Sequence, residues 1–300
     1  MSSRVERKDG YVNVSGLNLY YEDFVPDHIE GTIICLHGGP GASHDYLLPL
    51  SDLSNFGFRI VLYDQFGCGK SDEQKDTSKF TFDYAVEEVE GVRKQLCPEG
   101  KVFLMGSSYG GALALAYSLK YQSALLGMIV SGGLASSRLT IKEMNRLIDD
   151  LPEWASSAIR KYDATGDYTH PDYLKATEEF YSRHLIRMNP VPREVRLSLE
   201  YAEKRNVYRI MNGPNEFTIT GTIRDWDITD QIHKIVIPTL ITVGEYDEVT
   251  EVVAQEIHKR IKGSIMKVLP NCSHLSMWED REGYIATLKE FIDSVLSSAK

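Results

Sequence analysis

The 300-residue sequence predicts an α/β fold, in which helices flank a mostly parallel sheet that carries an inserted helical segment. Short apolar runs, typical of strands buried on both faces, alternate with stretches of helical periodicity. One long stretch in the middle of the chain has helical patterning alone. A strand, a sharp turn and a helix also meet at a single serine, Ser108. The alternation of strand and helix patterns indicates parallel strands joined by right-handed crossovers.

The first half of the chain reads as a hairpin followed by alternating strands and helices. Residues 11–21 form two alternating runs around Ser15 and Gly16, which predicts an antiparallel hairpin. The remaining segments are continuous apolar runs, which predict buried strands at 32–36, 59–63, 101–105 and 126–131, and helical patterns at 82–96 and 112–117.

The second half begins with a helical block and then returns to alternation. The block, rich in Tyr, Arg and Glu, includes helical runs at 141–151, 173–187 and 193–208. A strand at 237–243, a helix at 252–261, a strand at 265–269 and a helix at 284–296 follow. We therefore expect a sheet domain made of residues 1–133 and 223–300, and a helical cap domain of residues 134–222 that covers the strand ends as a lid.

Composition narrows the class of protein. The 43 acidic residues exceed the 33 Lys and Arg and give a net charge of −10, so the chain is a poor candidate for binding nucleic acid or an anionic membrane surface. No signal peptide and no apolar run of membrane-spanning length is visible. The cysteines lack CxxC spacing, and we expect free thiols in a reducing cytoplasm at Cys35, Cys68, Cys97 and Cys272.

Residues 106–110 (GSSYG) form the most informative motif. They follow an apolar strand and precede an alanine-rich helix, with Ser108 at the apex of the turn. Small residues must flank a serine in so tight a turn, and Gly106 and Gly110 satisfy that need. This is the nucleophile elbow of an α/β-hydrolase fold, so Ser108 is the candidate nucleophile and the sheet domain the catalytic domain.

The catalytic acid is expected just after a late strand, because the triad of this fold runs in the order Ser, acid, His. Three carboxylates compete after the strand that ends at Gly244: Glu245, Asp247 and Glu248. The spacing from Gly244 favours Asp247 as the catalytic acid. The simpler interpretation of Glu245 and of Glu248 is a solvated loop carboxylate.

The catalytic histidine is expected after the last strand. Only His258 and His274 follow Asp247 in the sequence. His258 lies in a charged helical run typical of a surface. His274 is therefore predicted to accept the proton of Ser108, with Asp247 holding its tautomer.

An oxyanion hole requires two hydrogen-bond donors. The backbone amide of Tyr109, which directly follows the nucleophile, is expected to be the first donor. Residues 37–41 (HGGPG) directly follow the third predicted strand, at 32–36, and predict the other donor at Gly39; a Gly/Pro-rich turn without a donor role is the alternative. Residues 64–71 (DQFGCGKS) lack the spacing of a phosphate-binding loop and are interpreted as a structural loop beside the site. We expect neither a metal nor a cofactor, since HExxH and clustered ligands are missing.

Together, the motifs at 37–41, 64–71, 106–111, 244–247 and 272–274 resemble those of the proline iminopeptidases, serine peptidases of the α/β-hydrolase fold that remove one residue from a peptide N-terminus. The resemblance extends to residues 206–217 and 274–280 and is strongest to the tricorn-interacting aminopeptidases of thermoacidophilic archaea. It implies a large upstream peptidase of the tricorn type as a partner, for which the sequence shows no docking motif.

The resemblance also implies how the substrate is held. Glu216, in the cap, and Glu248, after the catalytic acid, match carboxylates that bind the free α-ammonium, and Tyr208 matches a residue that lines the same pocket. A cap-surface acid, a helix N-terminal acid and a core tyrosine are the simpler interpretations of these three residues.

The expected function is that of a serine aminopeptidase, which releases an N-terminal proline or other apolar residue from short peptides through an acyl-enzyme. A carboxylesterase, C–C hydrolase or serine haloperoxidase would share the triad without needing the two glutamates, and N-acetylation of the substrate separates these possibilities. A catalytically inactive binding protein is disfavoured by the intact set Ser108, Asp247 and His274.

Overall fold

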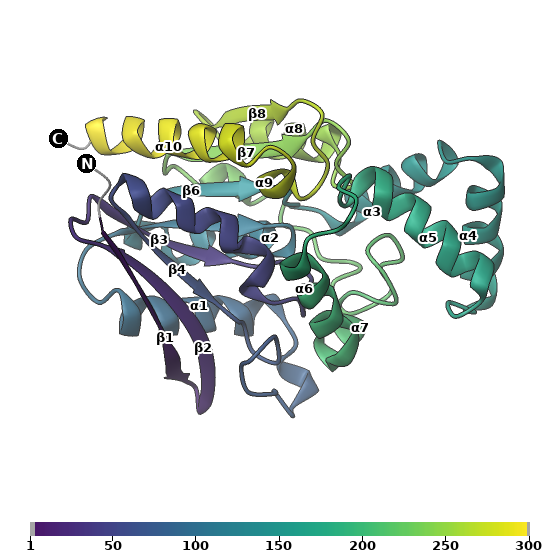
Figure 1. Cartoon of the computed structure of the whole chain (residues 1–300), viewed down its shortest axis with the longest axis horizontal. Helices are drawn as coiled ribbons and strands as arrows, with labels where there is room; N and C mark the ends of the chain where they lie inside the picture. The colour runs from purple at the N-terminus through teal and green to yellow at the C-terminus, as the bar shows by residue number, and fades with distance from the viewer. Residues whose placement is uncertain (1–3, 299–300) are drawn as a thin grey trace.

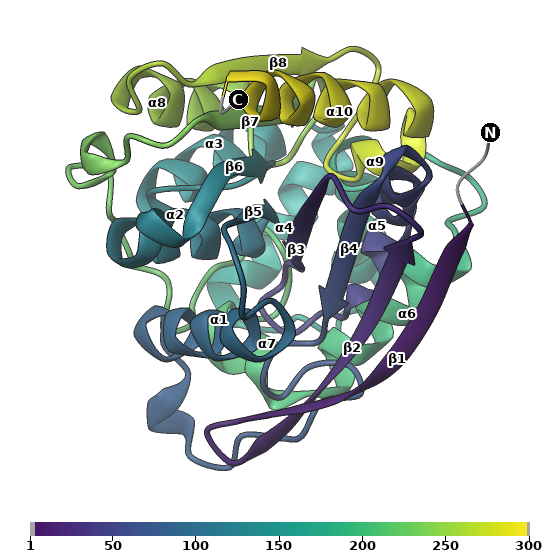
Figure 2. The same cartoon turned by 90° about the vertical axis from the view of Figure 1, so that its left-hand side faces the viewer.

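A computed structural model describes residues 4–298. Eight strands form one sheet in the order β1-β2-β4-β3-β5-β6-β7-β8. The pairs β1–β2 and β2–β4 are antiparallel, and every other neighbouring pair is parallel. In Figure 2 the twisted sheet runs from the long β1–β2 hairpin to β8 at the top. The strands are Val5–Val14, Leu17–Pro26, Gly31–Leu36, Phe58–Tyr63, Val102–Ser107, Leu125–Ser131, Thr239–Gly244 and Ile265–Leu269, numbered β1 to β8.

The sheet is covered on both faces, and each central strand divides its side chains between two cores. In β3, Ile34 and Leu36 pack into one core, and Ile33 and Cys35 pack into the other. This period-two division explains why the central strands read as continuous apolar runs. The helices α1 (Phe82–Leu96), α2 (Tyr109–Tyr121) and α8 (Glu251–Arg260) contribute to the first core, and η1 (His44–Phe56) and α10 (Arg281–Ser298) to the second.

Five α-helices lie between β6 and β7 in the sequence and gather at the end of the sheet opposite the chain termini (Figure 1). They are α3 (Ser137–Asp149), α4 (Glu153–Thr165), α5 (Pro171–His184), α6 (Arg193–Lys204) and α7 (Asn206–Met211). The remaining short helices are η2 (Thr77–Lys79), η3 (Gln122–Ala124), η4 (Ile232–Lys234) and α9 (Ser276–Glu279). No helix within residues 4–298 is long and apolar enough to cross a membrane.

The chain enters and leaves this helical segment through two strands of backbone that lie side by side. The Ile228 amide donates to the Ala135 carbonyl at 2.9 Å, and the Ser137 amide donates to the Trp226 carbonyl at 2.9 Å. Such paired crossings are typical of an inserted segment, because few contacts then link it to the rest of the chain. The division at residues 134 and 222 stays a prediction.

Among the elements that differ from the sequence-based expectation, three are informative. The predicted helix at 193–208 is two helices, because Arg205 adopts extended backbone with φ −105° and ψ 145°. The strand expected from residue 237 begins at Thr239, since Pro238 has no amide to donate to a neighbouring strand. The helix η1 was not expected at all; it contains Pro49 and lacks a strong periodic pattern.

Candidate active site

Ser108 stands at the sharp turn between β5 and α2, with φ 58° and ψ −125°. Positive φ is uncommon for a residue with a side chain and marks a conformation that its surroundings must hold in place. Those surroundings are crowded: a Cβ on Gly106 would lie 2.0 Å from the Gly110 carbonyl oxygen, and one on Gly110 would lie 2.1 Å from the Leu36 carbonyl oxygen. The half-buried Ser108 is thereby presented at the carboxyl end of the sheet.

The structure brings Asp247 and His274 into direct contact. Asp247 follows β7 and His274 follows β8, and Nδ1 of His274 lies 2.6 Å from Oδ1 of Asp247. The Asp247 carboxylate also accepts a hydrogen bond from the Val249 amide at 2.8 Å. Burial alone lowers the pKa of His274, but the charges of Asp247 and Glu248 outweigh it and raise the pKa to about 10. His274 and Ser108 line the same cavity.

The competing candidates lie elsewhere or play a different part. Glu245 is exposed and accepts a hydrogen bond from the Asn271 amide at 2.8 Å. His258 is also exposed, with Nδ1 2.8 Å from the Ser264 hydroxyl. Asp247 is therefore the carboxylate that contacts His274 through Nδ1.

Both expected oxyanion donors border the site. Tyr109 is the first residue of α2, so its amide belongs to the positively polarised N-terminus of that helix. Gly39 lines the cavity and has a φ of +113°, a conformation that favours glycine. The preceding amide, that of Gly38, already donates to the Tyr46 hydroxyl at 2.7 Å. Gly39 is thus the better-placed donor of the two glycines.

The third part of the site is a pair of glutamates, of which Glu216 is half-buried and Glu248 is buried. Glu216 lines the cavity and accepts a hydrogen bond from the Tyr208 hydroxyl at 2.7 Å. Glu248 is fully buried, neither carboxylate oxygen has a hydrogen-bond partner, and Oε1 lies 3.8 Å from Nε2 of His274. Burial raises the pKa of both glutamates, and the charge of Glu216 adds to the increase at Glu248. An unpaired buried carboxylate is costly, which points to a cation that completes it.

The cavity has a volume of about 50 Å³ that a water-sized molecule can occupy, and it is partly open to solvent. Its remaining lining is largely apolar. It comes from the loop before η1, from η1 itself, from the segment after α5, from α6 and from the loop of His274: Ala42, Tyr46, Leu185, Val195, Ser198, Leu199, Ala202 and Leu275. The combination of a catalytic set, an apolar wall and an anionic pair suits a small cationic substrate with an apolar side chain.

Comparison with known proteins identifies the family of this chain. A model of the alpha/beta hydrolase fold matches residues 31–281. A proline iminopeptidase of Thermoplasma volcanium is 58% identical over 286 residues, which span 95% of this chain and 97% of the relative. The proline iminopeptidase of Saccharolobus solfataricus is 53% identical over 290 residues, spanning 97% and 94%. The chain belongs to the proline iminopeptidase family.

Solved structures place the chain in the same family. The crystal structure of the proline iminopeptidase of Mycobacterium smegmatis has a TM-score of 0.92 and 31% identity, covering 98% of this chain and 100% of that one. An esterase from Exiguobacterium antarcticum has a TM-score of 0.68 at 23% identity, which shows the shared fold alone. The esterase alternative is therefore less supported than membership of the proline iminopeptidase family.

Sequence reasoning missed one contact that joins the two catalytic loops in this family member. The backbone carbonyl of His184, at the end of α5, accepts hydrogen bonds from the amides of Glu248 at 3.2 Å and His274 at 3.1 Å. The His184 ring also lies 2.9 Å, through Nδ1, from the Tyr246 carbonyl. A backbone carbonyl carries no sequence signal, so only the fold reveals this role of the helical segment.

Proposed function

We propose that this protein is a serine aminopeptidase that releases a single N-terminal residue, proline or another mainly apolar one, from short peptides. The observation that carries the proposal is the fully buried Glu248, whose carboxylate has no hydrogen-bond partner and lies 3.8 Å from Nε2 of His274. Glu216, which lines the cavity, is near enough for its charge to raise the pKa of Glu248. A free α-ammonium would supply the missing hydrogen bonds and charge. An internal peptide bond offers no such cation, so the pair selects chain ends.

In the proposed reaction, Ser108 Oγ attacks the first peptide carbonyl while Nε2 of His274 accepts its proton. The amides of Gly39 and Tyr109 bind the oxyanion that forms. His274 then gives the proton to the departing amine as the C–N bond breaks, which leaves an ester on Ser108. A water molecule, deprotonated by His274, hydrolyses that ester and releases the free amino acid.

We propose that residues 134–222 act as a lid on this site, because α6 and the segment after α5 supply much of the apolar wall. An apolar wall favours an apolar first side chain. Short peptides are the proposed partners, and a large upstream peptidase of the tricorn type, implied by the resemblance alone, would produce them. All four cysteines are free, buried thiols, as expected for a protein that works in the reducing cytoplasm.

The test is hydrolysis of aminoacyl-aminomethylcoumarins carrying Pro, Ala, Leu, Phe or Arg, each with a free and an acetylated amine. We expect turnover of the free amines only. Replacing Glu216 by Gln removes one charged partner of the ammonium, and hydrogen bonds to charged groups contribute about 1.5–3 kcal/mol. Glu216→Gln should therefore lower kcat/KM by about 10- to 100-fold.

The matched control is Glu245→Gln, which changes an exposed carboxylate of the acid loop and should keep wild-type kinetics. p-Nitrophenyl acetate reports the triad without the amine. If acetylated and free substrates are cut equally, or only the ester turns over, the aminopeptidase proposal is wrong and the esterase alternative replaces it.

A further inference from the structure

The loop that carries Gly39 is held at both ends by two consecutive residues, Asp64 and Gln65, which directly follow β4. At the first end, the Gln65 amide donates to Nε2 of His37 at 3.1 Å, and the Gln65 side chain donates to the His37 carbonyl at 2.7 Å. At the other end, Oδ1 of Asp64 accepts from the His44 amide at 2.8 Å and lies 2.8 Å from Nδ1 of the same residue. The parallel pairing of β3 and β4 brings these loops together.

The bond from Gln65 sets the tautomer of His37. Because Nε2 accepts a hydrogen bond, the ring proton is on Nδ1, which donates to the Gly38 carbonyl at 2.9 Å. That carbonyl belongs to the same peptide group as the Gly39 amide. In a trans peptide the C=O and the N–H point in opposite directions, so the His37 bond fixes the direction of the Gly39 N–H. Burial lowers the pKa of His37, which keeps its ring neutral.

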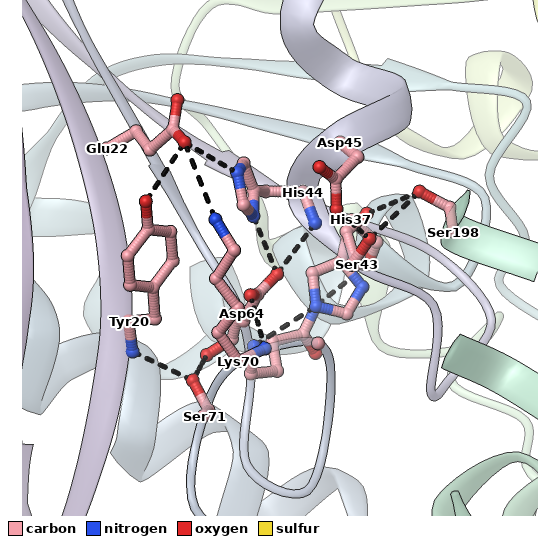
Figure 3. A network of polar contacts seen from close by, with 12 residues as sticks. Tyr20, Glu22, His37, Ser43, His44, Asp45, Asp64, Lys70, Ser71 and Ser198 are labelled. Atoms are coloured by element: carbon pink, nitrogen blue, oxygen red, sulfur yellow. Dashed lines mark hydrogen bonds and ion pairs between the residues drawn. The ribbon is translucent and has the colours of Figure 1, made fainter. Parts of the chain in front are cut away.

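The second end is held by charge. Asp64 is fully buried and accepts a further hydrogen bond from the Lys70 amide at 2.9 Å. His44 lies between two carboxylates, with Nε2 3.3 Å from Oε1 of Glu22 on β2 (Figure 3). Burial lowers the pKa of His44, but its contacts with the carboxylates of Asp64 and Glu22 outweigh burial and raise the pKa to about 10. A charged ring between two buried carboxylates holds the start of η1 in place.

We infer that Asp64 and Gln65 are positioning residues for the oxyanion hole: by holding His44 and His37, they aim the Gly39 amide at the carbonyl that Ser108 attacks. This assigns a catalytic purpose to the motif at residues 64–71. The inference uses the acyl transfer of the proposed function but not its preference for an amine. A small misplacement of an oxyanion donor is expected to cost rate, since such donors act on the transition state.

The test compares Asp64→Asn and Gln65→Met. Asp64→Asn replaces one acceptor oxygen by a donor. Gln65→Met removes the side-chain donor to the His37 carbonyl at similar volume and keeps the backbone amide that donates to Nε2, so it tests the hold of the Gln65 side chain on the loop. Each should lower kcat by about 10- to 100-fold and leave KM within about 2-fold, as expected when only transition-state binding is lost. The same loss should appear with Pro-aminomethylcoumarin and with p-nitrophenyl acetate. Affinity for pyrrolidine-2-boronic acid, whose tetrahedral adduct occupies the hole, should fall by the same factor, whereas affinity for pyrrolidine should not change.

The control is Asp72→Asn, an exposed carboxylate of the same loop that accepts from the Asn18 amide at 2.8 Å; it should keep wild-type kcat. If Asp64→Asn does not fold, Gln65→Met decides the question. The inference is overturned if a folded variant keeps kcat, or if it loses pyrrolidine affinity as much as boronic acid affinity. If the wild type cuts only the ester, the proposed aminopeptidase function fails. The ester data then still test whether Asp64 and Gln65 position the Gly39 amide.

Discussion

At the scale of single residues, the site is governed by charges placed close to one imidazole. Nδ1 of His274 contacts Asp247, as the triad requires, and Nε2 lies 3.8 Å from an unpaired oxygen of Glu248. The second carboxylate stabilises the protonated ring, which cannot accept a proton from Ser108. A bound ammonium would offset that charge, so anchoring the substrate and freeing the base are linked through Glu248.

This link predicts a pH shift in Glu248→Gln. A histidine with a raised pKa is protonated below that pKa, so activity rises as pH increases through it. Removing the Glu248 charge should lower the pKa of His274 and move the rising limb of the pH–rate profile to lower pH. The profile is measured with p-nitrophenyl acetate, which has no amine to bind. An unshifted limb would show that Glu248 does not influence the base; Glu245→Gln provides the control.

At the scale of elements, the helical segment is attached to the catalytic loops at a few defined points. Arg205, where α6 ends and α7 begins, donates to the Gly69 carbonyl at 2.8 Å and to Glu73 at 2.7 Å. The short helix α7 then lies against the loop of residues 37–41. The approach is so close that a Cβ on Gly41 would be 2.8 Å from the Tyr208 amide nitrogen. The break in the predicted helix therefore places Tyr208 at the site.

Loss of the Arg205 contacts should loosen α7 and weaken substrate binding. The contacts are partly exposed, since 22% of the Arg205 side chain is accessible, so their contribution is modest. We expect Arg205→Gln to raise KM by about 3- to 10-fold with little change in kcat. The exposed Arg209→Gln, which lies on the same helix, should leave KM unchanged. Equal KM values for both variants would refute this role of Arg205.

At the scale of the whole molecule, one buried ionic chain links the antiparallel edge of the sheet to the active-site loops. Glu22 of β2 contacts His44 of η1, which contacts Asp64 after β4. Burial opposes the charge of Glu22, but His44 outweighs it and lowers the pKa of Glu22 to about 2. These ionic contacts join elements of both cores to the active-site loops, so the charge state of their residues affects the stability of the whole molecule.

The raised pKa of His44 predicts an alkaline loss of stability. Its contribution is fully present below the ordinary value of 6.5 and is lost as pH rises toward about 10, because the unfolded ring releases its proton first. The melting temperature of the wild type should therefore fall more steeply across this range than that of His44→Gln. The variant is expected to be less stable at neutral pH, since two buried carboxylates lose their partner. Exposed His28→Gln is the control, and identical slopes for wild type and His44→Gln would contradict the prediction.

The sequence by itself determined the fold class and family, because both are written in local patterns. Short continuous apolar runs predict the central strands, and the glycines around Ser108 predict the elbow, since only small residues fit that turn. The order and spacing of Asp247 and His274 after late strands identified the two residues that the structure places in contact. Each of these signals lies within a few consecutive residues.

Only the tertiary structure decided how distant loops converge. Nothing local to Gln65 indicates that it orients the Gly39 amide through His37, and the carbonyl of His184 has no signature in the sequence. The packing of the inserted segment on the sheet brings Glu216 near enough to Glu248 for its charge to act on that carboxyl. The sequence suggested these two residues by resemblance alone. Such contacts depend on which strand ends are neighbours, and this is set by the long-range pairing of the sheet rather than by any one segment.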